Sequence, residues 1–292
     1  NVLHAWLRMV NIAFICLILT YGAVLFSKDA NKLVLQPLQR IIKRVNKIAM
    51  DPVKAKEQVA IVSKKKKSGF ENETVHIENA IIKIGKLLAL GFGDAGASIT
   101  AQNIAYSGEF SPNFPGKKEA AIFGFCDIRD FTVVTEVLQE EVMVFVNSVA
   151  QIVHSLVDRY GGSANKNTGD AFLMVWKFPE DVVVEHEDGQ LGILPTQESQ
   201  NIADAALISF LKIMGKINRD FTLLQYRENP VLQTRIPNYK VRLGFGLHFG
   251  WAIEGAMGSE YKIDASYLSA HVNLASQLEE AAKSYKVPLL FS

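Results

Sequence analysis

Apolar and polar residues are distributed differently in the two halves of this chain. Near the start, residues 9–27 contain no charged side chain and are bracketed by Arg8 and Lys28. A helix of nineteen residues extends about 28 Å, which is enough to cross the hydrocarbon core of a bilayer. We therefore expect one transmembrane helix here, with a buried core helix as the alternative. The run is long for a signal peptide and lacks a small-residue cleavage site.

Basic residues are concentrated directly after this apolar run. They are Lys28, Lys32, Arg40, Lys43, Arg44 and Lys47, followed by the lysine run 64–67. Because positive charge next to a membrane span stays on the cytoplasmic side, the C-terminal part of the chain is expected to face the cytoplasm. The lysine run itself fits either a solvated loop or a contact with anionic lipid headgroups.

A helical period continues over the following segment, residues 28–93. Apolar positions recur there at three- to four-residue spacing. They are Leu33, Leu38, Ile41, Ile42, Val45 and Ile48, then Val75, Ile81, Ile82, Ile84, Leu87, Leu88 and Leu90. Such helices either pair with a second copy as a coiled coil or pack on the protein's own domain. We assign residues 1–8 to a preceding segment, 28–93 to a helical linker with a basic loop, and 94–117 to a connector.

From residue 118 onward, strand-like and helix-like periods alternate. Strands are expected at 120–126, 241–249 and 252–257, a hairpin at 163–177, amphipathic helices at 137–160, 201–221 and 272–285, and a polar insertion loop at 180–199. A strand–helix–hairpin–helix–strand order fits a ferredoxin-like α+β core. Residues 118–292 are therefore expected to form one such domain, whose C-terminal end is incomplete in this sequence.

Composition narrows the classes of function. A net charge of +1 and a pI near 7.9 give no reason to expect a nucleic-acid partner. Cys16 and Cys126 cannot form a disulfide framework, which fits a reducing compartment for the main domain. No P-loop signature is present, so a Walker-type nucleotide site is unsupported. The chain starts with Asn and stops in an apolar run, so we expect a piece of a longer protein.

Two aspartates stand out by their sequence context. Asp127 lies in FGFCDIRDFT (residues 123–132), where an apolar strand ends on a carboxylate. Asp170 lies in GGSANKNTGDAFLMVWKF (161–178), at a tight turn between two strands. A helix between these segments would return the chain to the same sheet and bring both carboxylates to one edge. Two such carboxylates can hold a pair of magnesium ions, and the ions can carry a nucleoside triphosphate.

These segments, together with LGFGLHFGWAIEGAMGS (243–259) and SAHVNLASQLEEA (269–281), resemble the catalytic domain of class III adenylyl and guanylyl cyclases. The resemblance covers roughly residues 118–292, and the membrane-anchored layout is similar to that of adenylyl cyclases of unicellular eukaryotes. It implies a reaction in which the ribose 3′-hydroxyl attacks the α-phosphate and releases pyrophosphate and a cyclic nucleotide. It also implies active sites between two catalytic domains, in a homodimer or a heterodimer with a second cyclase domain.

The resemblance assigns the metal site to the first half of the domain. Asp127, Asp170 and the backbone carbonyl of Ile128 match the ligands of two magnesium ions, with manganese as an alternative. One ion would lower the pKa of the ribose hydroxyl, and the other would neutralise the triphosphate. Phe131 and Thr132 complete the DIxxFT pattern and are expected to pack beneath the triphosphate loop.

The resemblance also assigns residues that read the purine. Lys166 matches the first purine position, where a lysine can donate to N1 of adenine; guanine carries N1–H and prefers a carboxylate. ATP is therefore the expected substrate, and a guanylyl cyclase is disfavoured. The second purine position, an aspartate in the family, is Ala270, which cannot hydrogen-bond through its side chain. Ser269 or His271 could substitute for it.

One departure from the family pattern concerns catalysis itself. Asn273 matches the asparagine that orients the ribose, but the arginine expected one helical turn later is Gln277. A neutral amide lacks the charge and the bidentate fork of a guanidinium. Two functions therefore stay open. The chain is either an adenylate cyclase, a phosphorus–oxygen lyase in intracellular signalling, or a catalytically silent cyclase-like subunit with a structural or regulatory role in a membrane assembly.

Overall fold

The structure is a computed structural model that describes only part of the chain. The described residues are 2–31, 115–186, 191–259 and 261–292, with residues 35, 36, 39, 43, 80, 83, 96 and 189. The predicted linker helices, the lysine run and the connector therefore lie almost wholly outside the described residues. The chain divides into two compact units, 1–91 and 92–292, and each is considered by itself.

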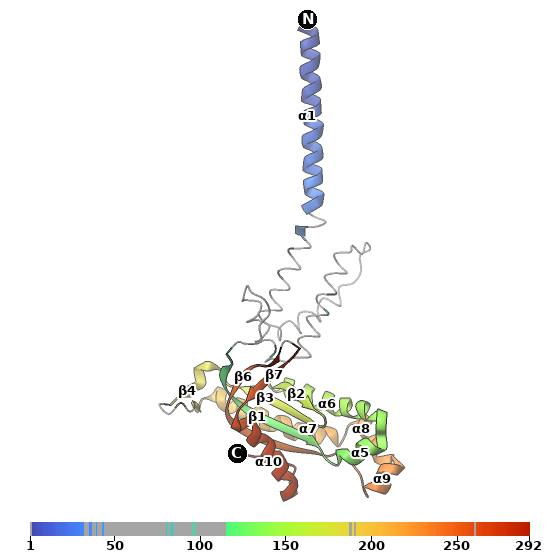
Figure 1. Cartoon of the computed structure of the whole chain (residues 1–292), viewed down its shortest axis with the longest axis vertical. Coiled ribbons are helices and arrows are strands. Elements are labelled where there is room, and N and C mark those ends of the chain that lie inside the picture. The colour runs from blue at the N-terminus through green and yellow to red at the C-terminus, as the bar shows by residue number, and fades with distance from the viewer. Residues whose placement is uncertain are drawn as a thin grey trace. The chain divides into compact units, whose positions relative to one another are not determined.

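The N-terminal unit contains one long helix, α1, which spans Val2–Ala30 and includes the predicted run 9–27 (Figure 1). Its segment Met9–Ala30 is long and apolar enough to cross a membrane, judged by length and composition. The Thr20 hydroxyl donates to the carbonyl oxygen of Cys16 at 2.7 Å, so this polar group is satisfied within the helix. An apolar N-terminal helix is thus confirmed ahead of the second unit.

A mixed α+β domain follows, built on one sheet in the order β2-β3-β1-β6-β7, with β8 also paired to β6. The strands are β1 Lys117–Ile128, β2 Ser163–Thr168, β3 Ala171–Lys177, β6 Leu243–Ser259, β7 Lys262–Leu268 and β8 Leu289–Phe291. The pairs in the main order are antiparallel, and β6 with β8 is parallel. The α+β prediction is confirmed, although β6 is one continuous strand where two were expected.

Helices and a small hairpin complete the domain. They are α5 Phe131–Leu138, α6 Val142–Arg159, β4 Val183–Glu185, β5 Leu191–Ile193, α7 Gln197–Ile217, α8 Phe221–Leu224, α9 Pro230–Arg235, α10 Ala270–Tyr285 and three single-turn 3₁₀ segments, Gln139–Glu141, Glu180–Val182 and Gln225–Glu228. The stretch 180–199, expected to be a loop, therefore contains the hairpin β4–β5 and the start of α7. The helix expected at 137–160 is interrupted at Gln139, where φ is +47°.

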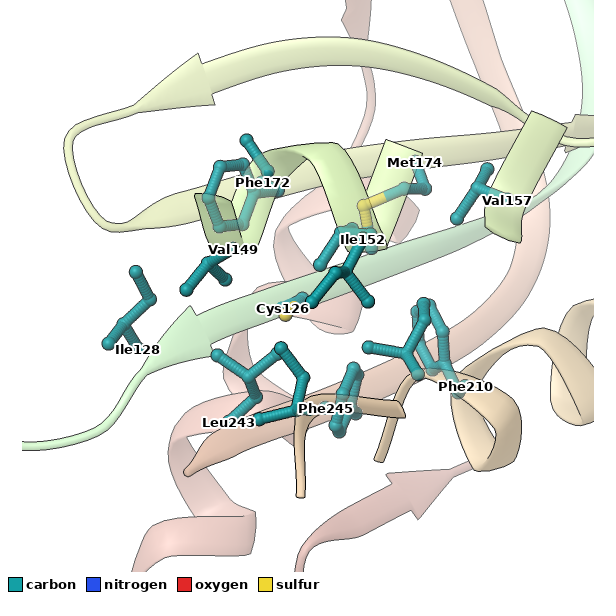
Figure 2. Close-up of a cluster of buried hydrophobic side chains, with 14 of the residues drawn as sticks. Cys126, Ile128, Val149, Ile152, Val157, Phe172, Met174, Phe210, Leu243 and Phe245 are labelled. Carbon is teal, nitrogen blue, oxygen red and sulfur yellow. The ribbon is translucent and has the colours of Figure 1, made fainter. Parts of the chain in front are cut away.

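Successive side chains of β1 point to opposite faces of the sheet, and each face is covered by a hydrophobic cluster. One set, which includes Ile122, Cys126 and Ile128, joins the larger hydrophobic core with residues of α6 and α7. Figure 2 shows this core, with Phe210 of α7 and Phe245 of β6 among the buried side chains. The alternate set packs in a second cluster with residues of α10. These core members are Ala121, Phe123, Leu173, Val175, Ala252, Ala265, Tyr267, Val272 and Ala275.

Helix α10 lies directly on strand β6. A Cβ atom at Gly246 would come within 2.2 Å of the carbonyl oxygen of Ala275 and 2.5 Å of the Glu279 backbone nitrogen. Only a residue without a side chain fits between the strand and the helix at this point. The helix begins after Ser269, whose hydroxyl accepts a hydrogen bond from the His271 backbone N–H at 3.0 Å. This close contact fixes α10 relative to the end of the sheet that carries Asp127.

Candidate functional site

Two acidic residues meet at one end of the sheet. Asp127 is the penultimate residue of β1, and Asp170 lies in the turn between β2 and β3. The backbone N–H of Ile128 donates to the carbonyl oxygen of Asp170 at 3.2 Å, and Asp127 is paired with Ala171 in the β1–β3 register. Ordinary strand pairing therefore brings the predicted ligands Asp127, Ile128 and Asp170 together.

The electrostatics of this end of the sheet favour a cation. Burial, together with the nearby carboxylates of Glu279 and Asp170, raises the pKa of Asp127 to about 6, while Arg129 opposes the shift. Carboxylate and carbonyl oxygens are the ligands that magnesium and manganese prefer. In the described part of the chain, no group of three or more His, Cys, Asp and Glu side chains is arranged to hold a metal. The two carboxylates and the Ile128 carbonyl are oxygen donors of the kind that divalent ions prefer.

The segment after β1 turns sharply into helix α5. Asp130 has φ +61°, and the helix begins at Phe131. Phe131 is partly buried against the larger core, whereas the side chain of Thr132 is exposed. The first turn of α5 therefore lies directly after the end of β1 that carries Asp127, anchored by the Phe131 ring. Free backbone N–H groups at a helix start are suited to anionic groups.

Lys166 contacts a residue that the sequence did not single out. Its ammonium donates to the Ser266 hydroxyl on β7 at 3.2 Å and lies 3.6 Å from Oδ2 of Asp264. Ser266 is only 6% exposed, so Lys166 contacts a buried hydroxyl group. Strands β2 and β7 occupy opposite ends of the strand order, yet their side chains meet. The Asn165 amide also donates to the Ala265 carbonyl oxygen at 3.4 Å.

This approach depends on an irregularity in β2. The β2–β3 register shifts between Ala164 and Lys166, which leaves Asn165 as a bulged residue. Bulges bend a strand and redirect its side chains. Ser266 could have been found from the sequence through the alternation of β7, because Asp264 and Ser266 share one face. The family pattern instead assigned the second purine position to Ala270, by its spacing from Asn273.

Ala270 and the two residues proposed to replace it lie elsewhere. Ala270 is the first residue of α10 and is exposed. The Ser269 hydroxyl caps α10, and Nδ1 of His271 lies 2.9 Å from Nε2 of His248 on β6. Ser269 and His271 are therefore committed to other contacts, while Ser266 is bonded to Lys166.

Asn273 and Gln277 lie one turn apart on the exposed side of α10. In the described part of the chain, neither side chain forms a hydrogen bond or an ion pair. The buried side of the same helix carries Glu279, whose Oε1 lies 2.6 Å from Nη1 of Arg129. The structure thus brings the predicted metal ligands together and places Lys166 against Ser266. It leaves Asn273 and Gln277 facing away from the chain's own core.

Known proteins are similar to this chain in sequence and in fold. A family model described as "Adenylate and Guanylate cyclase catalytic domain" matches residues 115–290. Another, described as "RasGEFs all helical domain", matches residues 1–105, which is less than half of the chain. An adenylate cyclase of Anabaena cylindrica is 25% identical over 169 residues, covering 58% of this chain and 28% of that protein.

Further relatives cover similar parts of the chain. A terminal-differentiation specific adenylate cyclase of Dictyostelium discoideum is 27% identical over 176 residues, 60% of this chain and 7% of that protein. The chain therefore spans less than a third of the length of these curated relatives. A bacterial light-regulated adenylyl cyclase superposes with a TM-score of 0.54 at 23% identity, over 77% of this chain and 57% of that one. The chain belongs to the adenylate and guanylate cyclase catalytic-domain family, and its C-terminal domain has the class III cyclase fold.

Proposed function

We propose that this chain converts ATP to cyclic AMP and pyrophosphate by two-metal phosphoryl transfer at the interface of two cyclase domains. The observation that carries the proposal is the meeting of Asp127 and Asp170 at one end of the sheet, linked through the 3.2 Å bond between Ile128 N–H and the Asp170 carbonyl. Family membership supports cyclase chemistry, and the choice of ATP rests on Lys166.

The metal-binding part of the site would be supplied by Asp127, Asp170 and the carbonyl of Ile128. Bound magnesium or manganese would supply acidification of the ribose hydroxyl and neutralisation of the triphosphate. The chain's own residues hold the donor atoms in place, because β1 and β3 are paired beside both aspartates. Phe131 fixes the start of α5, where the backbone N–H of Thr132 can donate to phosphate oxygens.

Base selection is proposed to rest on Lys166 and Ser266 rather than on Ala270. Adenine presents the N1 acceptor next to the N6 amine donor. The Lys166 ammonium is a donor and the Ser266 hydroxyl can accept, and these two groups lie 3.2 Å apart. Guanine carries a donor at N1, which an ammonium cannot satisfy. The side-chain arrangement therefore supports ATP over GTP.

A second domain would contact the ribose and the α-phosphate. Asn273 and Gln277 are exposed on α10, as expected if they act on the metal site of a partner. In a homodimer both sites would have complete metal ligands and a neutral amide at the transition-state position. Since a charged arginine at such a position contributes about 10³–10⁵ in rate, homodimer turnover should be slow. A heterodimer with an arginine-bearing cyclase domain would have one repaired site.

Gln277 also supports a second candidate function. A chain that keeps its metal ligands but lacks the transition-state charge could bind nucleotide as a silent subunit of a membrane assembly. In either case, helix α1 is proposed as a membrane anchor that holds the catalytic domain on the cytoplasmic side. Its length, its composition and the basic residues after it support this placement.

The test is a turnover assay of the full chain in detergent or lipid nanodiscs, with manganese and either ATP or GTP. Cyclic AMP formation that is lost in Asp127→Asn, with ATP preferred over GTP, is the expected result. Preference for GTP would reverse the substrate assignment. Micromolar binding of ATP without any cyclic AMP would establish the silent-subunit function instead.

A further inference from the structure

A buried ion pair lies beside the predicted metal ligands. Nη1 of Arg129 is 2.6 Å from Oε1 of Glu279 and 3.6 Å from Oδ1 of Asp127. Nη2 of the same guanidinium donates to the Glu279 backbone carbonyl at 3.3 Å. The side chains of Arg129 and Glu279 are only 15% and 11% exposed. Charges in such surroundings act on each other more strongly than charges in water.

The surroundings hold the ion pair in this position. A Cβ atom at Gly244 would lie 1.8 Å from Nη2 of Arg129 and 2.4 Å from Oε1 of Glu279. The guanidinium therefore passes across the bare backbone of β6, from the end of β1 to helix α10. Asp127 is paired with Gly244 in the β1–β6 register, so the aspartate, the arginine and the glutamate form one row.

This row gives the guanidinium two carboxylate partners at unequal distances. The contact with Glu279 is short and reinforced by the backbone carbonyl, whereas the contact with Asp127 is longer. Arg129 and a divalent ion both carry positive charge and both seek the Asp127 oxygens. Glu279 draws the guanidinium away from Asp127 and so leaves those oxygens available to a metal.

We propose that the Arg129–Glu279 ion pair sets the cation affinity of the Asp127–Asp170 site, with Arg129 competing for Asp127 and Glu279 restraining that competition. Both are positioning residues, since neither is a ligand itself. The inference rests on the proposed function, because it takes the two aspartates as metal ligands. It goes further by assigning a role to residues outside that donor set.

The test measures manganese binding to the full chain at pH 8 without nucleotide, by isothermal titration or electron paramagnetic resonance. Arg129→Gln should tighten binding by about 10-fold, because a positive charge close to Asp127 is removed. Glu279→Gln should weaken binding by about 10-fold, because Arg129 then turns fully to Asp127. The manganese affinity of the double variant should lie between those of the two single variants. The affinity of Arg129→Lys should be closer to that of the wild type than the affinity of Arg129→Gln is.

Lys212→Gln is the matched control, since it removes one positive charge from an exposed position of α7, without an ion pair in the described part of the chain. Its effect should stay within about 2-fold, as expected for a solvated charge. A purely structural ion pair predicts that both single variants loosen the site and shift affinity in the same direction. That result would overturn the inference while leaving the proposed function intact.

Failure of the proposed function has a different signature. If the wild-type chain binds no manganese that Asp127→Asn abolishes, the two aspartates are not metal ligands, and both proposals fall together. Circular dichroism and a thermal melt of each variant identify any loss of fold. Should Arg129→Gln not fold, Glu279→Gln is compared with the Lys212→Gln control, because a weakening of manganese binding beyond 2-fold is expected only of Glu279→Gln.

Discussion

The end of the sheet that carries Asp127 and Asp170 and the exposed side of α10 are built in contrasting ways. Asp127 and Asp170 are held by strand pairing and by a backbone hydrogen bond within one chain. Asn273 and Gln277 lie on a helix whose opposite side is fixed against β6, and their own side chains face outward. One region is held within a single chain, whereas the other, on the proposed function, acts only when a second domain faces it. Substitutions should therefore affect the two regions differently.

The largest effect is expected from Asp170→Asn. Turnover should fall by at least about 10³-fold, since a metal ion contributes several kcal/mol to the transition state and this change removes one of its carboxylate ligands. The backbone bond from Ile128 to the Asp170 carbonyl stays, so the melting temperature should not change. Asp158→Asn, an exposed change on α6, is the control and should leave turnover unaltered. Equal losses in both variants would show that general charge, rather than ligation, matters.

Gln277→Arg should change activity in the opposite direction. A guanidinium at this exposed position restores the missing positive charge, and homodimer turnover should rise by at least about 10²-fold. Gln277→Lys should give a smaller gain, because a lysine offers no bidentate fork. If turnover is unchanged while ATP still binds, the missing charge does not limit this domain and the silent-subunit function is favoured.

Lys166→Glu examines the base contact that joins β2 to β7. The ratio of kcat/KM for ATP to that for GTP should fall by at least about 10-fold, because the donor that matches adenine N1 is lost. Lys262→Glu is the control on strand β7, as this lysine also lies 3.7 Å from Oδ2 of Asp264 but its side chain is 81% exposed. A ratio that falls equally in both variants would mean that charge near Asp264, and not the Lys166–Ser266 pair, selects the base.

Gly246→Ala should separate the packing of α10 from the chemistry of its exposed side. The added methyl group collides with the helix backbone, so the free energy of unfolding should fall by about 1–3 kcal/mol. Gly215→Ala is a matched control in α7, where a Cβ atom meets nothing within 4 Å, and it should stabilise the fold by about 0.5–1 kcal/mol. Loss of stability in both variants would contradict the close contact between α10 and β6.

The smallest effect concerns His154, which packs edge-on against Phe172. Burial lowers the pKa of His154 from its ordinary value near 6.5. The unfolded chain then binds more protons than the folded one, so this residue makes stability fall as pH drops through 6.5. In thermal melts at pH 7.5 and 5.5, His154→Gln should show a smaller acid-induced loss than the wild type. An unchanged loss would remove His154 from the acid response.

The sequence predicted that Asp127 and Asp170 would meet at one end of the sheet, because this meeting depends on local geometry. A strand ending at Asp127 and a hairpin turn at Asp170 are visible in the sequence as apolar runs and turn residues. The pairing of β1 with β3 then brings the two aspartates together. The phase of α10 is likewise local, which is why Asn273 and Gln277 were placed on one side. Their chemical roles, like that of the metal ligands, stay predictions.

Contacts between residues far apart in the sequence could not be predicted in the same way. Ser266 meets Lys166 because a bulge at Asn165 and the long strand β6 bring together two strands from opposite ends of the strand order. The Arg129–Glu279 pair joins residues 150 positions apart across a glycine. Strand β6 continues through Gly250, where the sequence indicated a break, and the His271 ring lies directly beside that glycine. The linker predictions concern residues outside those described.

The most direct test of the account mixes two copies of the chain. One copy carries Gln277→Arg with Asp170→Asn, and the other is wild type, so neither homodimer has a complete site. The mixed dimer has one site with wild-type Asp127 and Asp170 facing the introduced arginine. Its cyclic AMP production should exceed the sum of the separate rates by at least about 10-fold, a conservative share of the charged-finger effect. A mixed dimer, verified by differential tags, that produces no more than this sum would contradict the division of the site between two chains.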